Sequence, residues 1–253
     1  MSDVLLSAAA VTRRFGGLTA VNGVSLDLLR GQVHAVIGTN GAGKSTLINI
    51  LSGELAASSG QVTLGSRDIT AWPQPERARA GLGRSYQRST IFPELSVFEN
   101  CRLAAQASRQ RFWHWWRDAA SCRRSAELAD AALDRTGLAG DARQPAGLLP
   151  HGRKRQLEIA MCLAGEPQVL LLDEPLAGMG AEETDRILAL LQTLKAGHAI
   201  LLVEHDMDAV FRIAETITVM VNGSAIASGA PAQIRANPEV RTAYLGEDGQ
   251  GAY

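Results

Sequence analysis

The sequence contains little cysteine, and no spacing typical of cysteine chemistry. Cys101, Cys122 and Cys162 form an odd set without a C-x-x-C pair. Such a set predicts neither a disulfide framework nor a zinc site, and it fits a reducing compartment. No run approaches the roughly 18 consecutive apolar residues of a membrane-spanning helix. Because the first residues also lack the basic region of a secretory signal, we expect a soluble, cytoplasmic chain.

An excess of either charge is also missing. The 253 residues include 25 Lys and Arg against 26 Asp and Glu, a formal net charge of -1. A chain so close to neutrality offers no broad basic surface for nucleic acid or anionic lipid, so we expect no nucleic-acid partner. Internal repeats, low-complexity tracts and linkers rich in Pro or Ser are absent as well. With 46% hydrophobic residues, the chain is expected to form one globular body with an insertion.

Apolar periodicity predicts alternating strands and helices. Short strand-like stretches lie at 8–15, 24–29, 33–38 and 61–65, and residues 44–55 read as a helix. The middle of the chain, from about Gln87 to Gly165, is rich in helix formers and arginine.

The last third reads as a βαβ unit followed by a hairpin. The runs QVLLLDE and AILLVE suit parallel strands buried on both faces, and a helical pattern lies between them. Asn222-Gly223 predicts a hairpin turn because both residues accept positive φ, and residues 231–245 read as a terminal helix interrupted by Pro238.

Residues 38–45, GTNGAGKS, match G-x-x-x-x-G-K-[ST] between an apolar strand and a helix. Glycines at these positions let the backbone wrap around phosphates, and amides at a helix start face an anion favourably. Lys44 is expected to reach the β- and γ-phosphates, and the Ser45 hydroxyl to bind Mg²⁺. The predicted phosphate-binding residues are Gly38, Asn40, Gly41, Ala42, Gly43, Lys44, Ser45 and Thr46. The alternative is a glycine-rich turn without a ligand.

Two polar clusters follow buried strands, where a parallel α/β sheet presents its ligand site. Asp173 and Glu174 end one strand; we expect Asp173 to hold Mg²⁺ and Glu174 to orient or deprotonate the attacking water. Alone, such an acidic pair is more often a helix cap, and only together with the phosphate-binding loop does it favour a nucleotide site. His205 follows the next strand and suits a contact to the γ-phosphate or the water, although a lone histidine there is usually a capping or surface residue.

The stretch LLPHGRKRQLEIA, residues 148–160, predicts an amphipathic helix. Leu157, Ala160, Met161 and Ala164 mark its apolar face, and Pro150 is compatible with its first turn. The amides of that turn can face an anion without help from a side chain.

Those motifs, in that order, resemble the nucleotide-binding subunit of ATP-binding cassette (ABC) transporters over nearly the whole chain. The resemblance implies an α/β P-loop NTPase fold, with a mostly parallel core sheet, an antiparallel β subdomain and a helical subdomain. It divides the single domain 1–253 into a nucleotide-binding core, 1–87 and 166–253, and a helical subdomain, 88–165. ATP and Mg²⁺ are the implied cofactors.

The resemblance also assigns roles to single residues. Phe15 matches the aromatic that stacks on adenine, where it would otherwise read as a core phenylalanine. Gln87 matches the glutamine that touches Mg²⁺ and the attacking water and senses the membrane partner. Without the family it would read as a surface polar residue. Gly180 stands where the family often has an aspartate that contacts the other subunit, which puts that communication in doubt.

The family places its signature, L-S-G-G-Q, at the start of the helix just described, where it faces the ATP of the opposite subunit. The aligned residues here are Leu149, Pro150, His151, Gly152 and Arg153. The serine hydroxyl is therefore missing, and a hydrogen bond to a charged group is worth about 1.5–3 kcal/mol. We hypothesise that Arg153 takes over part of the contact, with His151 as the alternative.

Several stretches are similar to the ATPase subunits of branched-chain amino-acid importers: the form LPHGRKRQLEIA, EPLAGMG, LVEHDMDAVFRIAETITVM and a terminal AYLGE. The partners implied are transmembrane permease subunits, a second ATPase subunit, identical or different, and an external solute-binding protein. The place implied is the inner face of the cell membrane. The resemblance to the lipopolysaccharide-export ATPase is more distant.

The Trp-rich segment 107–124 permits three interpretations: packing of the helical subdomain, a membrane-surface helix, or a permease contact.

Two other functions stay open for the whole chain. A non-transport ABC ATPase of DNA repair or translation would usually show two cassettes or basic arms, and a nucleotide-binding regulator would not need Glu174, His205 and Gln87.

Overall fold

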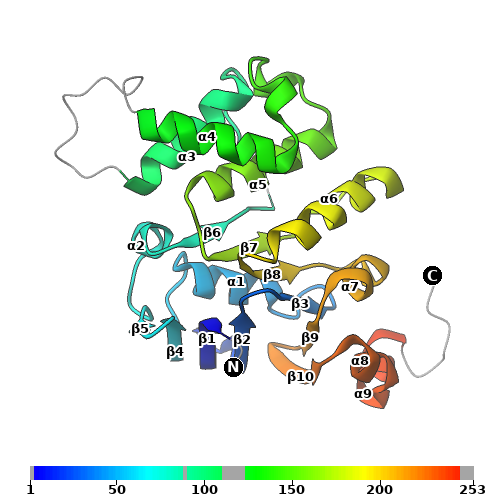
Figure 1. The fold of residues 1–253 in the computed structure, drawn as a ribbon. Helices are drawn as coiled ribbons and strands as arrows, with labels where there is room; N and C mark the ends of the chain where they lie inside the picture. The colour runs from blue at the N-terminus through cyan, green and yellow to red at the C-terminus, as the bar shows by residue number, and fades with distance from the viewer. Residues whose placement is uncertain (1–2, 88–89, 110–122, 246–253) are drawn as a thin grey trace.

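The computed structural model describes residues 3–87, 90–109 and 123–245 of the chain. Trp113, Trp115 and Trp116 of the Trp-rich segment lie outside these residues, as do Gly246 and Glu247 of the terminal AYLGE stretch. In the described part, helices gather above a central sheet and a second sheet lies below it (Figure 1).

The central sheet has six strands in the order β10-β9-β3-β8-β7-β6. Neighbouring strands from β9 to β6 are parallel, and only β10 pairs antiparallel, with β9. The strands are β3 (Val33–Gly38), β6 (Leu82–Arg84), β7 (Val169–Asp173), β8 (Ala199–Val203), β9 (Thr216–Val221) and β10 (Ser224–Gly229). Every residue of β3, β7 and β8 is buried, which confirms strands covered on both faces.

Alternate residues of β7 show how the two faces are covered. Leu170 and Leu172 pack with helices on one face of the sheet, whereas Val169 and Leu171 pack with residues of the segment 44–52 and of the second sheet on the other face. A side chain on one face is followed by one on the other because a strand has a period of two residues. The uninterrupted apolar runs in the sequence result from this two-sided burial.

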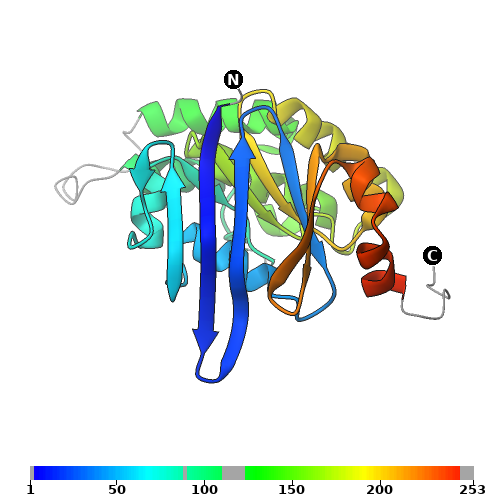
Figure 2. The same ribbon diagram turned by 90° about the horizontal axis from the view of Figure 1, so that it is seen from below.

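The second sheet is antiparallel, in the order β2-β1-β4-β5. Its strands are β1 (Val4–Phe15), β2 (Leu18–Leu29), β4 (Ser59–Leu64) and β5 (Arg67–Asp68). The long β1-β2 hairpin lies in front in the view from below, beside the β9-β10 hairpin (Figure 2). The mostly parallel sheet, the antiparallel sheet and the helices together confirm the expected fold class.

Helices form an upper layer above the central sheet in Figure 1, and further helices flank the sheets. The upper helices are α3 (Val97–Arg109), α4 (Arg123–Thr136) and α5 (His151–Ala164), with 3-10 turns η3 (Ala139–Asp141) and η4 (Ala146–Leu148). The others are α1 (Lys44–Ser52), α2 (Gln74–Arg79), α6 (Ala181–Leu194), α7 (Met207–Ile213), α8 (Pro231–Ala236) and α9 (Pro238–Leu245). The break between α8 and α9 confirms the interruption at Pro238. Within the described residues, no helix combines the length and apolar character needed to cross a bilayer.

Candidate active site

The phosphate-binding loop connects β3, in the middle of the central sheet, to α1. Two of its glycines are required by close contacts. A Cβ on Gly38 would lie 2.3 Å from the carbonyl oxygen of Met220, and a Cβ on Gly43 would lie 2.3 Å from that of Ala20. Gly43 also has a φ of 97°, which favours glycine. The loop therefore packs backbone against backbone on β2 and β9, and a side chain would lift it away.

Lys44 opens α1, and its ammonium lies inside the loop. The Nζ atom donates to the carbonyl oxygens of Gly38, at 2.6 Å, and Thr39, at 3.1 Å. Burial lowers the pKa of Lys44, and the nearby carboxylates of Glu174 and Asp173 oppose that shift. This position fits a lysine that reaches phosphates held by the loop.

A cavity of about 420 Å³ opens over the loop. It is lined by residues 40–46 together with Gln87 and Glu174, so residues far apart in the sequence meet as expected. Leu18, Thr19, Ala20, Asn222 and Gly223 complete the wall, and the sequence reading missed them. Gly223 donates to the carbonyl of Ala42, so the hairpin turn also supports the phosphate-binding loop.

Asp173 lies at the carboxyl end of β7 and is buried. Its Oδ2 atom lies 3.7 Å from Nη2 of Arg84, and its Oδ1 atom is buried without a hydrogen-bond partner among the described residues. Burial raises the pKa of Asp173, while Arg84 acts in the opposite direction. Since α6 begins only at Ala181, Asp173 does not cap a helix.

An oxygen-rich set at this position fits a magnesium ion. Among the described residues, no cluster of three or more His, Cys, Asp or Glu side chains is placed to hold a metal. Magnesium, however, is usually bound by one or two carboxylates together with waters and substrate phosphates. Ser45 and Gln87 line the cavity and offer a hydroxyl and an amide oxygen for that mode of binding. Asp173 is not among the lining residues, but its Oδ1 atom is buried without a partner among the described residues.

Glu174 has a φ of 49°, a conformation that non-glycine residues seldom adopt. Its Oε2 atom accepts a hydrogen bond of 2.9 Å from Nε2 of Gln87. Its Oε1 atom lies 4.0 Å from Nδ1 of His205. His205 is not the cap of α7, because Asp206 fills that place and accepts from Ala209. The unusual backbone at Glu174 is typical of a functional site.

Glu204 is a buried carboxylate beside this group that the sequence reading overlooked. It accepts hydrogen bonds from the backbone amides of Leu176, at 2.8 Å, and His205, at 3.2 Å. Burial raises its pKa, and these amides oppose the shift. Glu204 thus ties the segment after Glu174 to the segment that presents His205. Its position at the end of an apolar strand is the feature of the sequence from which this residue could have been predicted.

Phe15 ends β1 with 45% of its surface exposed, so it is not a core phenylalanine. The Arg13 guanidinium lies 4.7 Å from the centre of its ring. Phe15 is not among the residues that line the cavity, whereas Leu18, just beyond it on the hairpin, is. Adenine stacking by Phe15 stays an expectation.

The predicted signature residues lie at the start of α5 and do not line this cavity. Pro150 precedes the helix, which begins at His151. Two polar groups here have partners within the chain: the amide of Gly152 donates to Oε1 of Glu183 at 3.2 Å, and Nε2 of His151 lies 3.1 Å from the carbonyl oxygen of Ala177.

Arg153 also has partners within the chain. Its guanidinium pairs with the Asp141 carboxylate and donates to the carbonyl of Gly137. A contact from Arg153 to a further anion would have to compete with this ion pair or use the remaining N–H donors of the guanidinium.

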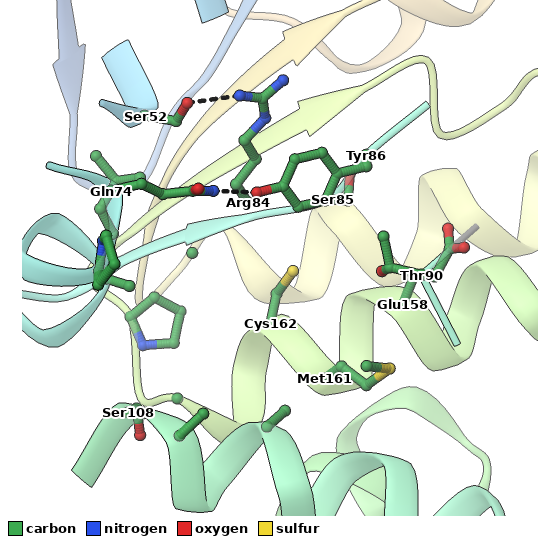
Figure 3. A pocket seen from close by; sticks show the side chains of 18 of the residues that line it. Ser52, Gln74, Arg84, Ser85, Tyr86, Thr90, Ser108, Glu158, Met161 and Cys162 are labelled. Atoms are coloured by element: carbon green, nitrogen blue, oxygen red, sulfur yellow. Dashed lines mark hydrogen bonds between the residues drawn. The ribbon is translucent and has the colours of Figure 1, made fainter. Parts of the chain in front are cut away.

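A groove of about 320 Å³ lies between the upper helices and the end of β6. Gln74, Arg84 and Tyr86 line one side, and Met161 and Cys162 from α5 line the other (Figure 3). The amide of Gln74 donates to the Tyr86 hydroxyl, and the Arg84 guanidinium lies 4.7 Å from the centre of the Tyr86 ring. Because Tyr86 immediately precedes Gln87, the groove adjoins the nucleotide cavity.

Comparisons with known proteins agree with this geometry. The sequence model of the ABC transporter family matches residues 21–177, and that of the branched-chain amino acid ATP-binding cassette transporter matches residues 226–250. A high-affinity branched-chain amino acid transport ATP-binding protein of Salmonella typhimurium is 40% identical over 98% of this chain and 100% of its own length. A protein of Pseudomonas aeruginosa with the same description shows the same identity and coverage.

Solved structures give the same result. A nucleotide-free ATP-binding cassette from an ABC transporter superposes with a TM-score of 0.86 at 30% identity, covering 96% of this chain and 100% of its own. The ADP conformation of such a cassette gives a TM-score of 0.85 at 30% identity, covering 96% of this chain and 99% of its own. With the phosphate-binding loop, Gln87 and Glu174 around one cavity, the chain belongs to the ABC transporter family and is an ATP-binding, ATP-hydrolysing cassette.

Proposed function

We propose that this cassette powers the uptake of branched-chain or related amino acids through membrane permease partners, at the inner face of the cell membrane. The match of residues 226–250 to the branched-chain amino acid cassettes carries the choice of cargo. Relatives aligned over almost the full chain are described as transport proteins for these amino acids, which supports the same choice.

The arrangement around Glu174 supports the proposed chemistry. Gln87 and Glu174, joined by their 2.9 Å hydrogen bond, face the same cavity as the phosphate-binding loop. Lys44 and the loop amides bind the phosphates, and Glu174 orients the attacking water and accepts its proton. His205, close to Glu174, supplies a further polar contact to the γ-phosphate.

Ser45, Gln87 and Asp173 are the residues that would hold Mg²⁺. When bound, this ion neutralises the charge that develops on the phosphates. The buried, unpartnered Oδ1 atom of Asp173 supports this assignment. In the proposed working form, two cassettes enclose two nucleotides, and residues 149–153 of each face the nucleotide of the other.

The groove beside Gln87 is where we place the permease contact. Gln87 bonds to Glu174 inside the nucleotide cavity, and its neighbour Tyr86 lines the groove. A segment that binds there and moves Tyr86 also moves Gln87, so this place suits communication between permease and nucleotide.

Mg²⁺-dependent phosphate release from ATP tests the chemistry. Wild type should release phosphate, whereas Glu174→Gln should retain ATP, accumulate as a dimer on size exclusion and lose at least about a hundredfold in rate, the lower end of the range for one general base. Glu127→Gln, on an exposed part of α4, is the matched control and should behave as wild type. Equal rates for wild type and Glu174→Gln would refute the role of Glu174.

The cargo needs a separate experiment, since the cassette binds ATP and permease while solute is selected elsewhere. Purification of the complex with its permeases and solute-binding protein, followed by titration of that binding protein with leucine, isoleucine and valine, should give saturable binding. Binding of a sugar or metal ion instead would contradict the proposed cargo.

A further inference from the structure

A buried ion pair lies where α5 lines the groove. Nη1 of Arg155 lies 2.8 Å from Oε2 of Glu158, and the two side chains are only 9% and 4% exposed. The other carboxylate oxygen, Oε1, is buried and has no hydrogen-bond partner among the described residues. Glu158 lines the groove together with Met161 and Cys162 (Figure 3). Buried acceptors are almost always hydrogen-bonded in native proteins, so this oxygen calls for a partner.

Arg155 connects the pair to the segment that carries Gln87. Its Nη1 atom donates to the carbonyl oxygen of Tyr86, and its Nη2 atom to that of Gln87, both at 3.0 Å. The Gln87 side chain then donates to Glu174 at 2.9 Å. Polar contacts therefore run without interruption from Glu158 in the groove to the proposed catalytic carboxylate.

We propose that Arg155 and Glu158 are positioning residues for ATP hydrolysis, and that Oε1 of Glu158 accepts a hydrogen bond from a permease segment in the groove. The occupant has an apolar face for the wall formed by Leu82, Ala104 and Met161, and it carries an amide or cationic donor for Glu158. This inference rests on the proposed function, because that function supplies the permease. With the donor in place, Arg155 holds Tyr86 and Gln87 where Gln87 supports Glu174.

Stability alone does not account for the pair. Replacing both members of a buried ion pair by apolar residues is often neutral or stabilising, whereas removing one member leaves an unpaired buried charge and destabilises the protein. A packing role and a positioning role therefore predict different behaviour for the double replacement.

The full-length chain gives the first test. The double variant Arg155→Met with Glu158→Leu should keep a melting temperature close to wild type and bind ATP within about twofold, because the phosphate-binding loop is unchanged. Its kcat should fall at least about tenfold, since Gln87 loses its anchor. The matched control replaces Glu99 and Arg102, an ion pair of the same spacing on α3, with Leu and Met, and should leave kcat unchanged. Wild-type kcat in a folded double variant would overturn the positioning role.

Glu158→Gln gives the second test and keeps the side-chain shape. The isolated variant should lose less of its kcat than the double variant, because its side-chain amide oxygen can still accept from Arg155. In the complex purified with its permeases, the ratio of ATPase activity with permease to that of the cassette alone should fall about fivefold or more. An unchanged ratio would refute the donor contact. Failure of the wild-type cassette to hydrolyse ATP or to associate with a permease would instead refute the proposed function.

Discussion

The two loop glycines Gly41 and Gly43 permit a sharp test of how the phosphate-binding loop is held. Both have positive φ, at 79° and 97°. A Cβ on Gly41 would meet nothing within 4 Å, whereas a Cβ on Gly43 would lie 2.3 Å from the carbonyl oxygen of Ala20. Alanine at the two positions therefore introduces a similar backbone strain but a steric conflict at one of them only.

The expected magnitudes follow from those contacts. Left-handed backbone costs a non-glycine residue about 1–2 kcal/mol, which is the whole expected loss for Gly41→Ala. Overpacking adds about 1–3 kcal/mol, so Gly43→Ala should lose about 2–5 kcal/mol in total. The obstructing atom belongs to the backbone of β2, and relief of the contact has to displace the loop or the strand.

Equilibrium unfolding in urea, monitored by far-UV circular dichroism, measures both losses. With m-values unchanged, the midpoint of Gly43→Ala should shift about 1.5 to 4 times as far as that of Gly41→Ala. Gly43→Ala should also bind ATP more weakly, because the amides that face the phosphates move with the loop. Equal midpoint shifts would show that the contact with Ala20 does not hold the loop, and the reasoning would fail.

Three further outcomes are expected from other parts of the chain. Burial raises the pKa of Cys101 and Cys162 to about 12. Because the thiolate is the form that reacts, peptide mapping should find both cysteines alkylated much more slowly at pH 7.5 in the native chain than in urea. Equal alkylation rates would contradict this. Burial, and next the neighbouring Arg135, lower the pKa of His198 in the folded chain. The stability that the neutral His198 contributes is therefore complete above about pH 6.5, the pKa of an unperturbed histidine, and is lost as the pH falls through the folded pKa. Calorimetry should show a weaker acid dependence for His198→Gln, and an unchanged dependence would refute the link. If Arg153 serves the nucleotide of a second cassette, Arg153→Ala should lower the ATPase activity. Asp141→Asn removes the carboxylate charge but leaves Arg153 in place, so this variant should retain the activity. Equal losses of activity in the two variants would show that the ion pair is purely structural.

Local motifs made much of the nucleotide site predictable. The loop from Gly38 to Ser45 is recognisable because strand, glycines, lysine and helix follow one another without a gap. Strand ends located Asp173 and Glu174 for a similar reason: parallel strands present their carboxyl ends at one edge of the sheet. The hydrogen bond between Gln87 and Glu174 links distant positions. The family resemblance assigned Gln87 to the attacking water, where Glu174 was also expected, but it did not predict the bond itself.

Contacts between distant segments could not be read from local patterns. Glu204 directly precedes His205 at a strand end, yet nothing in its neighbourhood shows that it accepts the amide of Leu176. The pair Arg155 and Glu158 has the spacing of an ordinary surface pair on a helix. Its burial arises because α5 packs against the segment after β6, which depends on the tertiary fold.

Pro150 shows how loss of a side-chain cap can leave the start of α5 intact. Proline supplies no hydroxyl, and α5 has no side-chain cap from the residue before it. Glu183 of α6 provides the missing acceptor at the Gly152 amide. A carboxylate near a helix N-terminus is favourable both as an acceptor and for its charge. The structural part of a serine's role is thus met within the chain, whereas the contact with a nucleotide of a second cassette is not. If residues 149–153 face the nucleotide of a second cassette, as proposed, Glu183 and the incoming phosphate compete for the same Gly152 amide, and that carboxylate has to move aside.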